Sequence, residues 1–469
     1  FRPISLMQFF WKCFEKLLQF ENKKHCGSRH YRQHGFREKF STETALTVAA
    51  NIIEHSLIKH EFCLAVALDL TNCFGTLPFA PVVAKMKQIG CKDEFIGVLK
   101  DFMENRRMNI AYKGVNLTKY CTIGQGQGSC ISPWAFSIIC DEILLELDEF
   151  WDNSEEEVKF HFNAFADDLV LFTTGQNLAH LFVVMQSALQ RCVYWAERNG
   201  LLFEPTKSTV CLHTRKKKYN RIALNDYIDQ EQLQVKLYDK KIEKVPTYKY
   251  LGVTFDEKLD YAVHLDNKIK EAKRTIGRVW SHFSKLKGMT PRFCLFLWTT
   301  CIRPKLTYGC FLWAKNLQWG DTIRKLNSVQ RFALKTMGHF RSKMAGCILE
   351  AVTGCLPLPL FVLGVAICTL VRTRGHVEFS NEEMVTFQPK LRGHRSYLRD
   401  KIAELGLNEL NILESEMDGM QKFYHFDKKY VVDSFSFDQA KNPLAGVPKR
   451  DEDISCFSDG SYTGFGKCG

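Results

Sequence analysis

The sequence predicts an α+β fold in which helices surround an antiparallel sheet that carries acidic residues. Three stretches indicate this. Residues 160–172 place Asp167 and Asp168 between two apolar runs, as expected of a β-hairpin with both carboxylates at its turn. Residues 62–68 form a continuous apolar run, typical of a strand buried on both faces. Residues 262–345 have helical periodicity, with lysine and arginine crowding the polar face.

The composition is that of a globular protein with a basic excess. The chain has 469 residues, of which 45% are hydrophobic and 25% charged, and its net charge is +12. That length allows about two to four domains. The positive charge favours a polyanionic partner, most simply nucleic acid. None of the 18 cysteines forms a CxxC pair or a zinc-ligand spacing, so we expect free thiols in a reducing compartment.

Neither a signal peptide nor a membrane span is expected. The chain opens Phe1-Arg2-Pro3 without a methionine, so we expect it to be part of a longer polypeptide. The longest apolar run, 356–371, contains two prolines and is short for a membrane span. A buried helix is the favoured interpretation of that run.

The N-terminal half alternates helices with strands. Residues 1–60 are basic and mostly helical, and Ser41-Thr42 is the expected cap of an apolar-periodic helix. The strand 62–68 ends at Asp69, where a charge is either exposed at the sheet edge or functional. Residues 71–75 follow as a turn.

A glycine-rich loop precedes the next helix. Gly124, Gly126 and Gly128 alternate with polar residues, which lets backbone amides approach a ligand closely. Ser132-Pro133 is a helix start, a cap followed by proline at the first helical position. A plain linker is the alternative interpretation of this loop.

The hairpin is followed by a helix and further strands. The helix is expected at about 177–199, with Gly200 as its C-terminal cap. Residues 201–211 return as a turn and a strand, with Lys207 at the start of the strand. Residues 248–255 are expected to form another strand, in which Gly252 indicates a bend or a close backbone approach.

Three carboxylates form the candidate site. If the strand ending at Asp69 neighbours the hairpin in one antiparallel sheet, Asp69, Asp167 and Asp168 converge. Such a set can hold two divalent cations, which clamp the attacking and leaving oxygens of a phosphoryl displacement. An Asp-Asp hairpin turn is also common on turn chemistry alone. The order of strand, glycine loop, acidic hairpin and lysine-bearing turn is more specific than any one of them.

These pieces together resemble the reverse transcriptase of a non-LTR (LINE-type) retrotransposon. Phe1-Arg2-Pro3-Ile4-Ser5-Leu6 resembles the family's opening motif, and Gln33-His34-Gly35-Phe36-Arg37 resembles its fingers motif. The later motifs match in the family's order: Asp69 with Phe74 (A), Gly126-Gln127-Gly128 (B), Phe165-Ala166-Asp167-Asp168 (C), Gly200-Leu201 with Lys207 (D) and Tyr250-Leu251-Gly252 (E).

The resemblance implies an RNA-directed DNA polymerase shaped as a right hand, with fingers, an antiparallel-sheet palm and a helical thumb. It implies two Mg²⁺ ions, or Mn²⁺ instead, bound by Asp69, Asp167 and Asp168, with Lys207 beside the leaving pyrophosphate. The remaining implied contacts are the nucleotide (Arg37, Phe74, Gln127 and Gly128) and the primer end (Tyr250, Leu251 and Gly252). Independently of the resemblance, the basic face of the helix that carries Lys270, Lys273, Arg274 and Arg278 suits a nucleic-acid backbone.

The implied partners are an RNA template, a DNA primer or nicked target DNA, and deoxynucleotides, without a membrane. The implied location is intracellular, nuclear during integration and cytoplasmic otherwise. The oligomeric state stays open. The expected domains are fingers (1–60), palm with fingers insertions (61–258), thumb (259–345), helical connection and linker (346–450) and the start of an RNase H domain (451–469), in which Asp459 would bind metal.

Three positions depart from the family's pattern. Gly75 stands where motif A usually has Asp, Gly126 where motif B usually has Pro, and Glu204 where motif D usually has Asn. None of these positions is a metal ligand. The alternatives are a catalytically dead nucleic-acid-binding remnant and an intron-maturase-like reverse transcriptase.

Overall fold

The computed structural model describes most of the chain before residue 406 and two short strands near its end. The described residues are 5, 7–22, 29–37, 39–104, 106–121, 123–126, 128–152, 157–215, 218–283, 291–337, 343–374, 394–405, 462–463 and 467–468. The chain divides into two compact units, Phe1–Ser415 and Glu416–Gly469. In the second unit, β12 (Tyr462–Thr463) pairs antiparallel with β13 (Lys467–Cys468).

A five-stranded sheet in the order β4-β5-β1-β6-β9 organises the first unit. Its central strand is the apolar run predicted above, and the predicted acidic hairpin supplies the two strands on one side of it. Every pairing is antiparallel except that of β6 with β9. The strands are β1 (Phe62–Leu68), β4 (Val158–Phe165), β5 (Asp168–Gly175), β6 (Thr209–His213) and β9 (Glu243–Lys244).

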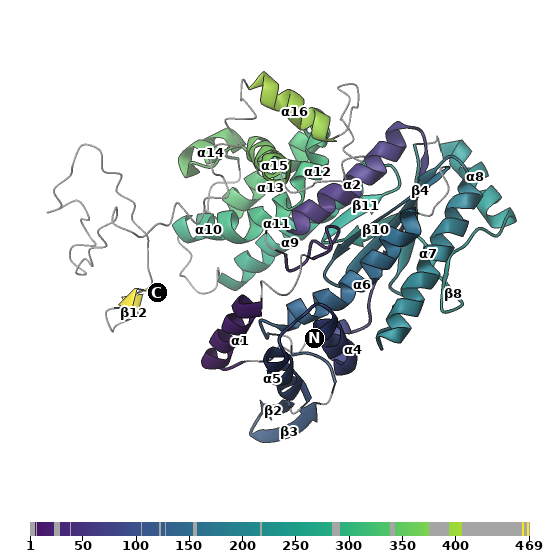
Figure 1. The fold of residues 1–469 in the computed structure, drawn as a ribbon. Helices are drawn as coiled ribbons and strands as arrows, with labels where there is room; N and C mark the ends of the chain where they lie inside the picture. The colour runs from purple at the N-terminus through teal and green to yellow at the C-terminus, as the bar shows by residue number, and fades with distance from the viewer. Residues whose placement is uncertain are drawn as a thin grey trace. The chain divides into compact units, whose positions relative to one another are not determined.

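One face of this sheet packs against helices that follow the predicted motifs. Leu64, Val66 and Leu171 belong to this first core. Figure 1 shows α6 and α7 side by side against the sheet, and α4 packs on both α5 and α6. The helices are α3 (Cys73–Thr76), α4 (Phe79–Gln88), α5 (Asp93–Glu104), α6 (Ser132–Asp152) and α7 (Leu178–Arg198).

The opposite face belongs to a second core, which the sheet shares with α2 (Thr42–Ile58), the β10–β11 hairpin and the helices that follow it. Ala65, Val170 and Phe172 alternate with the first-core residues along their strands and point into this core. The Ser41 hydroxyl accepts from the Thr44 amide, and the Thr44 hydroxyl accepts in return from the Ser41 amide. This capping box confirms the predicted helix start.

Residues 248–255 form a hairpin rather than the single strand predicted. Leu251 and Gly252 both have positive φ, at 44° and 81°, as in a two-residue hairpin turn of type I′. The glycine therefore reverses the chain instead of bending one strand. The two strands are β10 (Thr247–Tyr250) and β11 (Val253–Asp256).

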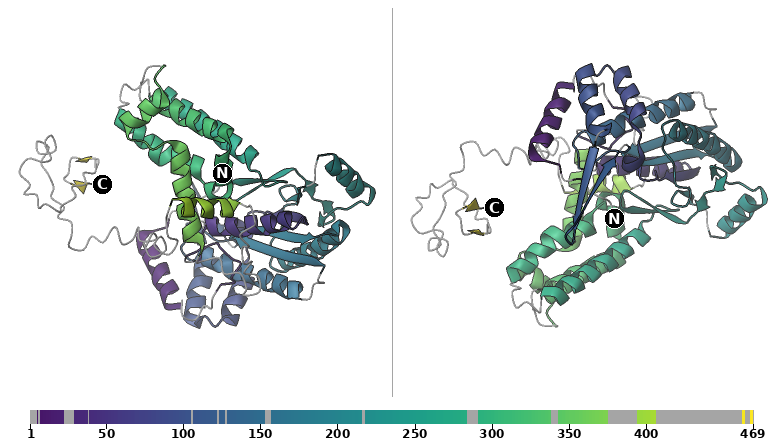
Figure 2. Two further views of the ribbon diagram at one scale, coloured as in Figure 1. Left: turned by 90° about the horizontal axis from the view of Figure 1, so that it is seen from above. Right: turned by 90° about the horizontal axis from the view of Figure 1, so that it is seen from below.

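The described residues between 262 and 404 are mostly helical. Figure 2 shows most of them, in green, grouped beside the sheet. Leu306 from the predicted thumb and Val362 and Leu398 from the predicted connection share the second core. The elements are α9 (Ala262–Phe283), α10 (Pro291–Leu297), the π-helical η2 (Trp298–Ile302), α11 (Arg303–Thr307), α12 (Cys310–Trp313), the 3₁₀-helical η3 (Ala314–Gln318), α13 (Gly320–Met337), α14 (Gly346–Thr353), α15 (Leu358–Arg374) and α16 (His394–Glu404).

The predicted buried helix at 356–371 is α15, whose Leu358, Val362 and Ala366 have no exposed surface. Within the described residues, no helix alone has the length and apolar character to cross a membrane. The bent pair formed by 346–353 and 358–373 meets those two criteria jointly.

Smaller elements surround this arrangement, and no sequence pattern above predicted the β2–β3 hairpin. Both strands of that hairpin are largely exposed. The elements are α1 (Phe9–Asn22), β2 (Arg106–Tyr112), β3 (Val115–Cys121), α8 (Lys218–Gln230), β7 (Lys236–Leu237) and β8 (Lys240–Lys241).

Candidate active site

The register of the sheet brings Asp69 and Asp168 together. The last pair between β1 and β5 is Leu68 with Leu169. Asp69 follows Leu68 and Asp168 precedes Leu169, so the two aspartates stand opposite each other one step beyond that pair. Because side chains alternate along strands, both belong to the face that bears the second core.

Asp167 lies at the tip of the β4–β5 hairpin. Pairing runs as far as Phe165 with Asp168, which leaves Ala166 and Asp167 as a two-residue turn. Ala166 has a φ of 56°, a conformation that such turns require at their first position. The Cys73 thiol, at the start of α3, donates to Asp167 Oδ2 at 3.6 Å. The segment that follows Asp69 therefore contacts the acidic turn directly.

Lys207 reaches the same place from the other side of β1. Its Nζ lies 3.4 Å from Asp69 Oδ2, and both side chains are more than a third exposed. The backbone fixes this approach: Leu70 bridges to Phe203, and the Glu204 amide donates to the Asp69 carbonyl at 2.8 Å. An exposed ion pair of this kind adds at most about 1 kcal/mol to stability. The location of the pair is therefore more informative than its strength.

The three carboxylates are a suitable donor set for a hard divalent cation. As the side chains stand, the described residues contain no group of three or more His, Cys, Asp or Glu side chains gathered closely enough to hold an ion. Adjacent carboxylates repel one another when no cation lies between them, and Asp69 is turned toward Lys207. Metal binding by Asp69, Asp167 and Asp168 stays a prediction.

Comparison with known proteins agrees with this geometry. Residues 1–255, more than half of the chain, match the family model described as reverse transcriptase (RNA-dependent DNA polymerase). The chain belongs to the reverse transcriptase family. This match confirms the reverse transcriptase part of the resemblance noted above.

Two curated relatives, both from Drosophila melanogaster, illustrate this likeness. One, described as a probable RNA-directed DNA polymerase from transposon BS, is 21% identical over 86% of this chain and 41% of its own length. The other is the RNA-directed DNA polymerase from mobile element jockey, 24% identical over 59% of this chain and 27% of its own length. This reverse transcriptase chain thus spans less than half the length of either relative.

Among solved structures, a telomerase from Candida tropicalis in complex with a fragment of telomeric RNA matches with a TM-score of 0.36. The sequence identity is 10%, over 82% of this chain and 56% of that one.

The predicted sugar contact in this reverse transcriptase, Phe74, directly follows Cys73, whose thiol contacts Asp167. It sits on α3 and is partly buried, with its ring 4.9 Å from that of Phe136 and edge-on to Phe36 at 6.4 Å. One side of the ring is thus fixed by the first core. The contact of this ring with a sugar stays a prediction.

The motif B loop packs on α3. The Gly124 amide donates to the Leu77 carbonyl, and a Cβ on Gly124 would lie 2.3 Å from the Gly75 carbonyl oxygen, so glycine is required there. Gly128 is exposed with a φ of 122°, whereas Gln127 lies outside the described residues. Gln125, which the sequence did not single out, is buried, and among the described residues neither polar atom of its side chain has a hydrogen-bond partner.

Arg37 does not reach the carboxylates in this structure. Its guanidinium lies 4.0 Å over the Phe40 ring and donates to the backbone carbonyls of His30 and Tyr31. Burial lowers the pKa of this guanidinium. The predicted contact with a triphosphate would require the side chain to leave these carbonyls, and it stays a prediction.

The motif E hairpin lies close to Asp168. Tyr250 is buried, its hydroxyl accepts from Asn163 Nδ2 at 3.3 Å, and burial, together with the Asp168 charge, raises its pKa. The Leu251 carbonyl accepts from the Tyr308 hydroxyl at 2.9 Å. Tyr250 therefore anchors the hairpin, while Leu251 and Gly252, both partly exposed, form its turn, and their contact with a primer stays a prediction.

The predicted backbone contacts occupy one helix. Ile269, Ala272 and Ile276 bury one face of α9 in the second core. The four predicted contacts are all exposed on the remainder of that helix: Lys270, Lys273, Arg274 and Arg278.

Two buried polar residues near the site were not predicted. Asn163 Nδ2 donates both to the Ala45 carbonyl and to Tyr250, which ties α2 and the motif E hairpin to β4. The Glu15 carboxylate accepts from the Ser129 hydroxyl at 2.6 Å and from the Cys130 amide at 2.7 Å, so α1 is held against the motif B loop. A single Asn in a strand or Glu in a helix gives no sequence signal of such contacts.

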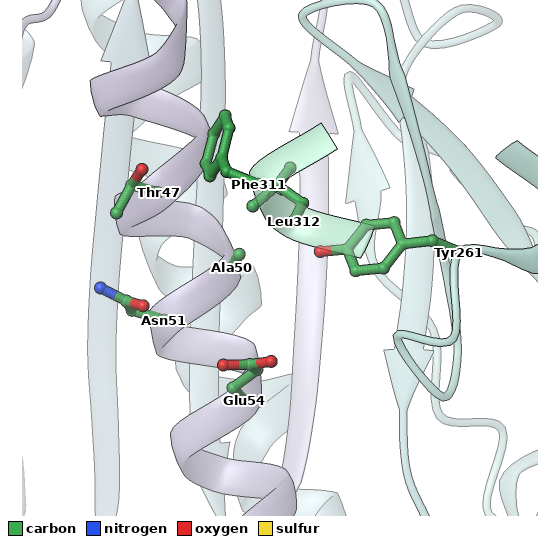
Figure 3. Close-up of a pocket in the computed structure, with 7 residues that line it drawn as sticks. All are labelled: Thr47, Ala50, Asn51, Glu54, Tyr261, Phe311 and Leu312. Carbon is green, nitrogen blue, oxygen red and sulfur yellow. The ribbon is translucent and has the colours of Figure 1, made fainter. Parts of the chain in front are cut away.

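The pocket in Figure 3 is separate from these residues. Its lining comes from α2, which includes Ala50 and Glu54, and from Tyr261 and Phe311 on the other side. Its free volume of about 10 Å³ is that of a single water molecule. A nucleotide does not fit there, and the open end of the sheet remains the candidate site.

Proposed function

We propose that this chain is the part of a non-LTR retrotransposon protein that copies the element's RNA into DNA, primed on nicked target DNA. The observation that carries the proposal is the placement of Asp69 opposite Asp168, with Asp167 and Lys207 beside them. The family match supports the reaction type. The enzyme would act in the nucleus during integration and reside in the cytoplasm otherwise.

Asp69, Asp167 and Asp168 would hold two Mg²⁺ or Mn²⁺ ions, which when bound stabilise charge on the attacking and leaving oxygens of nucleotidyl transfer. Lys207, free to turn from Asp69 because it is exposed, would neutralise or protonate the leaving pyrophosphate. These roles use side chains that three separate segments deliver to one end of the sheet.

The surrounding residues would position the substrates. Phe74 would press on the deoxyribose, and Arg37 would leave its backbone carbonyls to contact the triphosphate, for which its forked guanidinium is suited. Gln127 and Gly128 would border the templating base. The turn at Leu251 and Gly252 would support the primer end, and the basic face of α9 would follow the phosphate backbone.

Primer extension tests the proposal. The 469-residue chain should extend a DNA primer on an RNA template with Mg²⁺, and Asp168→Asn should reduce the rate roughly 1000-fold, since several kcal/mol of charge stabilisation is lost. Template–primer binding should stay nearly unchanged, because affinity comes from the basic surface. Asp226→Asn, at an exposed aspartate of α8, is the matched control. A chain that binds template–primer but never extends it would be the inactive remnant.

The RNase H start is also kept as a proposal. Asp459 lies outside the described residues, and the two short strands that follow it form an antiparallel pair. One carboxylate cannot hold two metal ions, so we expect no cleavage of an RNA–DNA hybrid by this 469-residue chain alone. Hybrid cleavage that Asp459→Asn abolishes would contradict that expectation.

A further inference from the structure

Gln33 holds the acidic turn from a segment far away in the sequence. Its Oε1 accepts from the Ala166 amide at 2.9 Å and from the Gly35 amide at 2.8 Å, and its Nε2 lies 3.4 Å from the Ala166 carbonyl. The side chain is fully buried. A single glutamine therefore satisfies both the N–H and the C=O of the residue that precedes Asp167.

The backbone around Gln33 is fixed to the same hairpin. Gln33 forms a parallel bridge with Ala164, in which the His34 amide donates to the Ala164 carbonyl at 2.8 Å and the Ala164 amide donates to the Arg32 carbonyl at 3.1 Å. These bonds make residues 32–34 a short extension of the sheet beside β4. The position of the Gln33 side chain is thus set by backbone bonds on both sides of it.

The turn that Gln33 holds is conformationally costly. Ala166 has a φ of 56°, a region that residues with a Cβ enter at a cost of about 1–2 kcal/mol. Gly35 lies against it so closely that a Cβ on Gly35 would be 2.3 Å from the Ala166 nitrogen. A turn in this conformation keeps one geometry only when its surroundings enforce it.

We propose that Gln33 is a positioning residue for the reaction: it fixes the Ala166 peptide and thereby the placement of the Asp167 and Asp168 carboxylates that would hold the metal ions. This deepens the proposed polymerase function and rests on it. Partners that orient metal-ligating carboxylates change metal affinity or activity by roughly 10- to 100-fold when they are removed. The competing explanation is that Gln33 is only a buried brace that stabilises the fold.

The test compares Gln33→Met, which keeps the side-chain length but loses all three contacts, with Gln330→Met. Gln330 is equally buried and donates to Glu350 and to the Leu356 carbonyl, far from the hairpin in sequence, so it is a matched loss of a buried amide. Two measurements are made on the 469-residue chain. One is amide hydrogen exchange of the peptide 160–172 without metal, and the other is the Mg²⁺ concentration for half-maximal extension.

Gln33→Met should accelerate exchange in the hairpin peptide and raise the half-saturating Mg²⁺ concentration roughly 10- to 100-fold. Gln330→Met should change neither, even where it lowers the melting temperature. If Gln33→Met lowers the melting temperature but leaves both quantities at the Gln330→Met values, Gln33 is only a brace. Should Gln33→Met fail to fold, Gly35→Ala, which presses on the Ala166 nitrogen, is read by the same two criteria.

The exchange measurement needs no catalysis, which separates this proposal from the proposed function. If the parent chain never extends a primer, the proposed polymerase function is wrong. Faster hairpin exchange in Gln33→Met would still support the contact. An extending parent with an unchanged hairpin in all the Gln33 and Gly35 variants removes the positioning role alone.

Discussion

The Lys207 ammonium lies 3.4 Å from the Asp69 carboxylate, although the two residues come from different strand ends of the sheet. Lys207 thus occupies the place where a cation bound to Asp69 would compete with it. The same side chain is proposed to serve the leaving pyrophosphate. These two possibilities have opposite consequences when the lysine is removed.

Lys207→Gln should lower the maximal extension rate by about 10²-fold or more, the usual contribution of a positioned proton donor, with little change in the Michaelis constant. Single-turnover extension across a range of Mg²⁺ concentrations measures this. Lys240→Gln, at an exposed lysine of β8, is the control. If Lys207→Gln instead extends faster at low Mg²⁺, the lysine is only a competitor for Asp69.

Phe74→Val should increase ribonucleotide incorporation relative to deoxyribonucleotide. The ring is fixed against Phe136 on one side, so a smaller side chain opens space where a 2′-hydroxyl would otherwise collide. Competition between the two sugars in single-nucleotide extension gives the ratio. Phe182→Val, in the first core on α7, controls for loss of stability. An unchanged ratio would make Phe74 a core residue only.

Neutralising Lys270, Lys273, Arg274 and Arg278 together should weaken template–primer binding for every sequence. It should also flatten the dependence of log affinity on log salt, because each phosphate contact releases counterions. The matched control neutralises four exposed lysines of the β7–β9 region, Lys236, Lys240, Lys241 and Lys244. Equal salt slopes for the parent and the α9 variant would show that this face is merely solvated.

His34 should make the fold acid-sensitive. Burial, with smaller contributions from the Arg37 and Arg32 charges, lowers its pKa to about 3, whereas an unfolded histidine titrates near 6.5. The unfolded chain therefore binds the extra proton first, and stability falls as the pH drops from 6.5 toward 3.

Because of this single group, the free energy of unfolding of the parent should be about 2 kcal/mol lower at pH 5 than at pH 7.5. In urea unfolding, the stability difference between the parent and His34→Gln should shrink by that amount between the two pH values. A difference that stays constant would contradict the assignment. His213 and His264, whose pKa values burial lowers to about 4, serve as internal comparisons through their own variants.

The sequence was sufficient to predict those elements whose pattern depends on residues close together in the chain. The apolar run before Asp69, the paired runs around Asp167 and the capping Ser41 each depend on neighbours in the chain, and each lies where it was predicted. The sequence left the pairing of the strand before Asp69 with the hairpin as a condition, and the β1–β5 register meets that condition.

Contacts between distant segments could not be predicted in the same way. Gln33 meets Ala166, and Glu15 meets Ser129, through single polar atoms that leave no periodicity. The motif E segment was mistaken for one strand because Leu251 gives no turn signal, and only its positive φ reveals the reversal. The position of the Arg37 side chain could not be predicted for a different reason. Its long, charged side chain donates to the nearby carbonyls of His30 and Tyr31 where no anion is present.

The second core also restricts how the polymerase could grip and release nucleic acid. A rigid-body rotation of α9 away from the sheet would separate Ile269 and Ile276 from Trp298 and from the rest of the second core, which they share with the sheet. Each exposed Å² of apolar surface costs about 25 cal/mol, so a hinge at the base of the helix is unfavourable. Because Val279 packs on the same core as well, we expect α9 to keep its place on the sheet while a template moves along the polymerase.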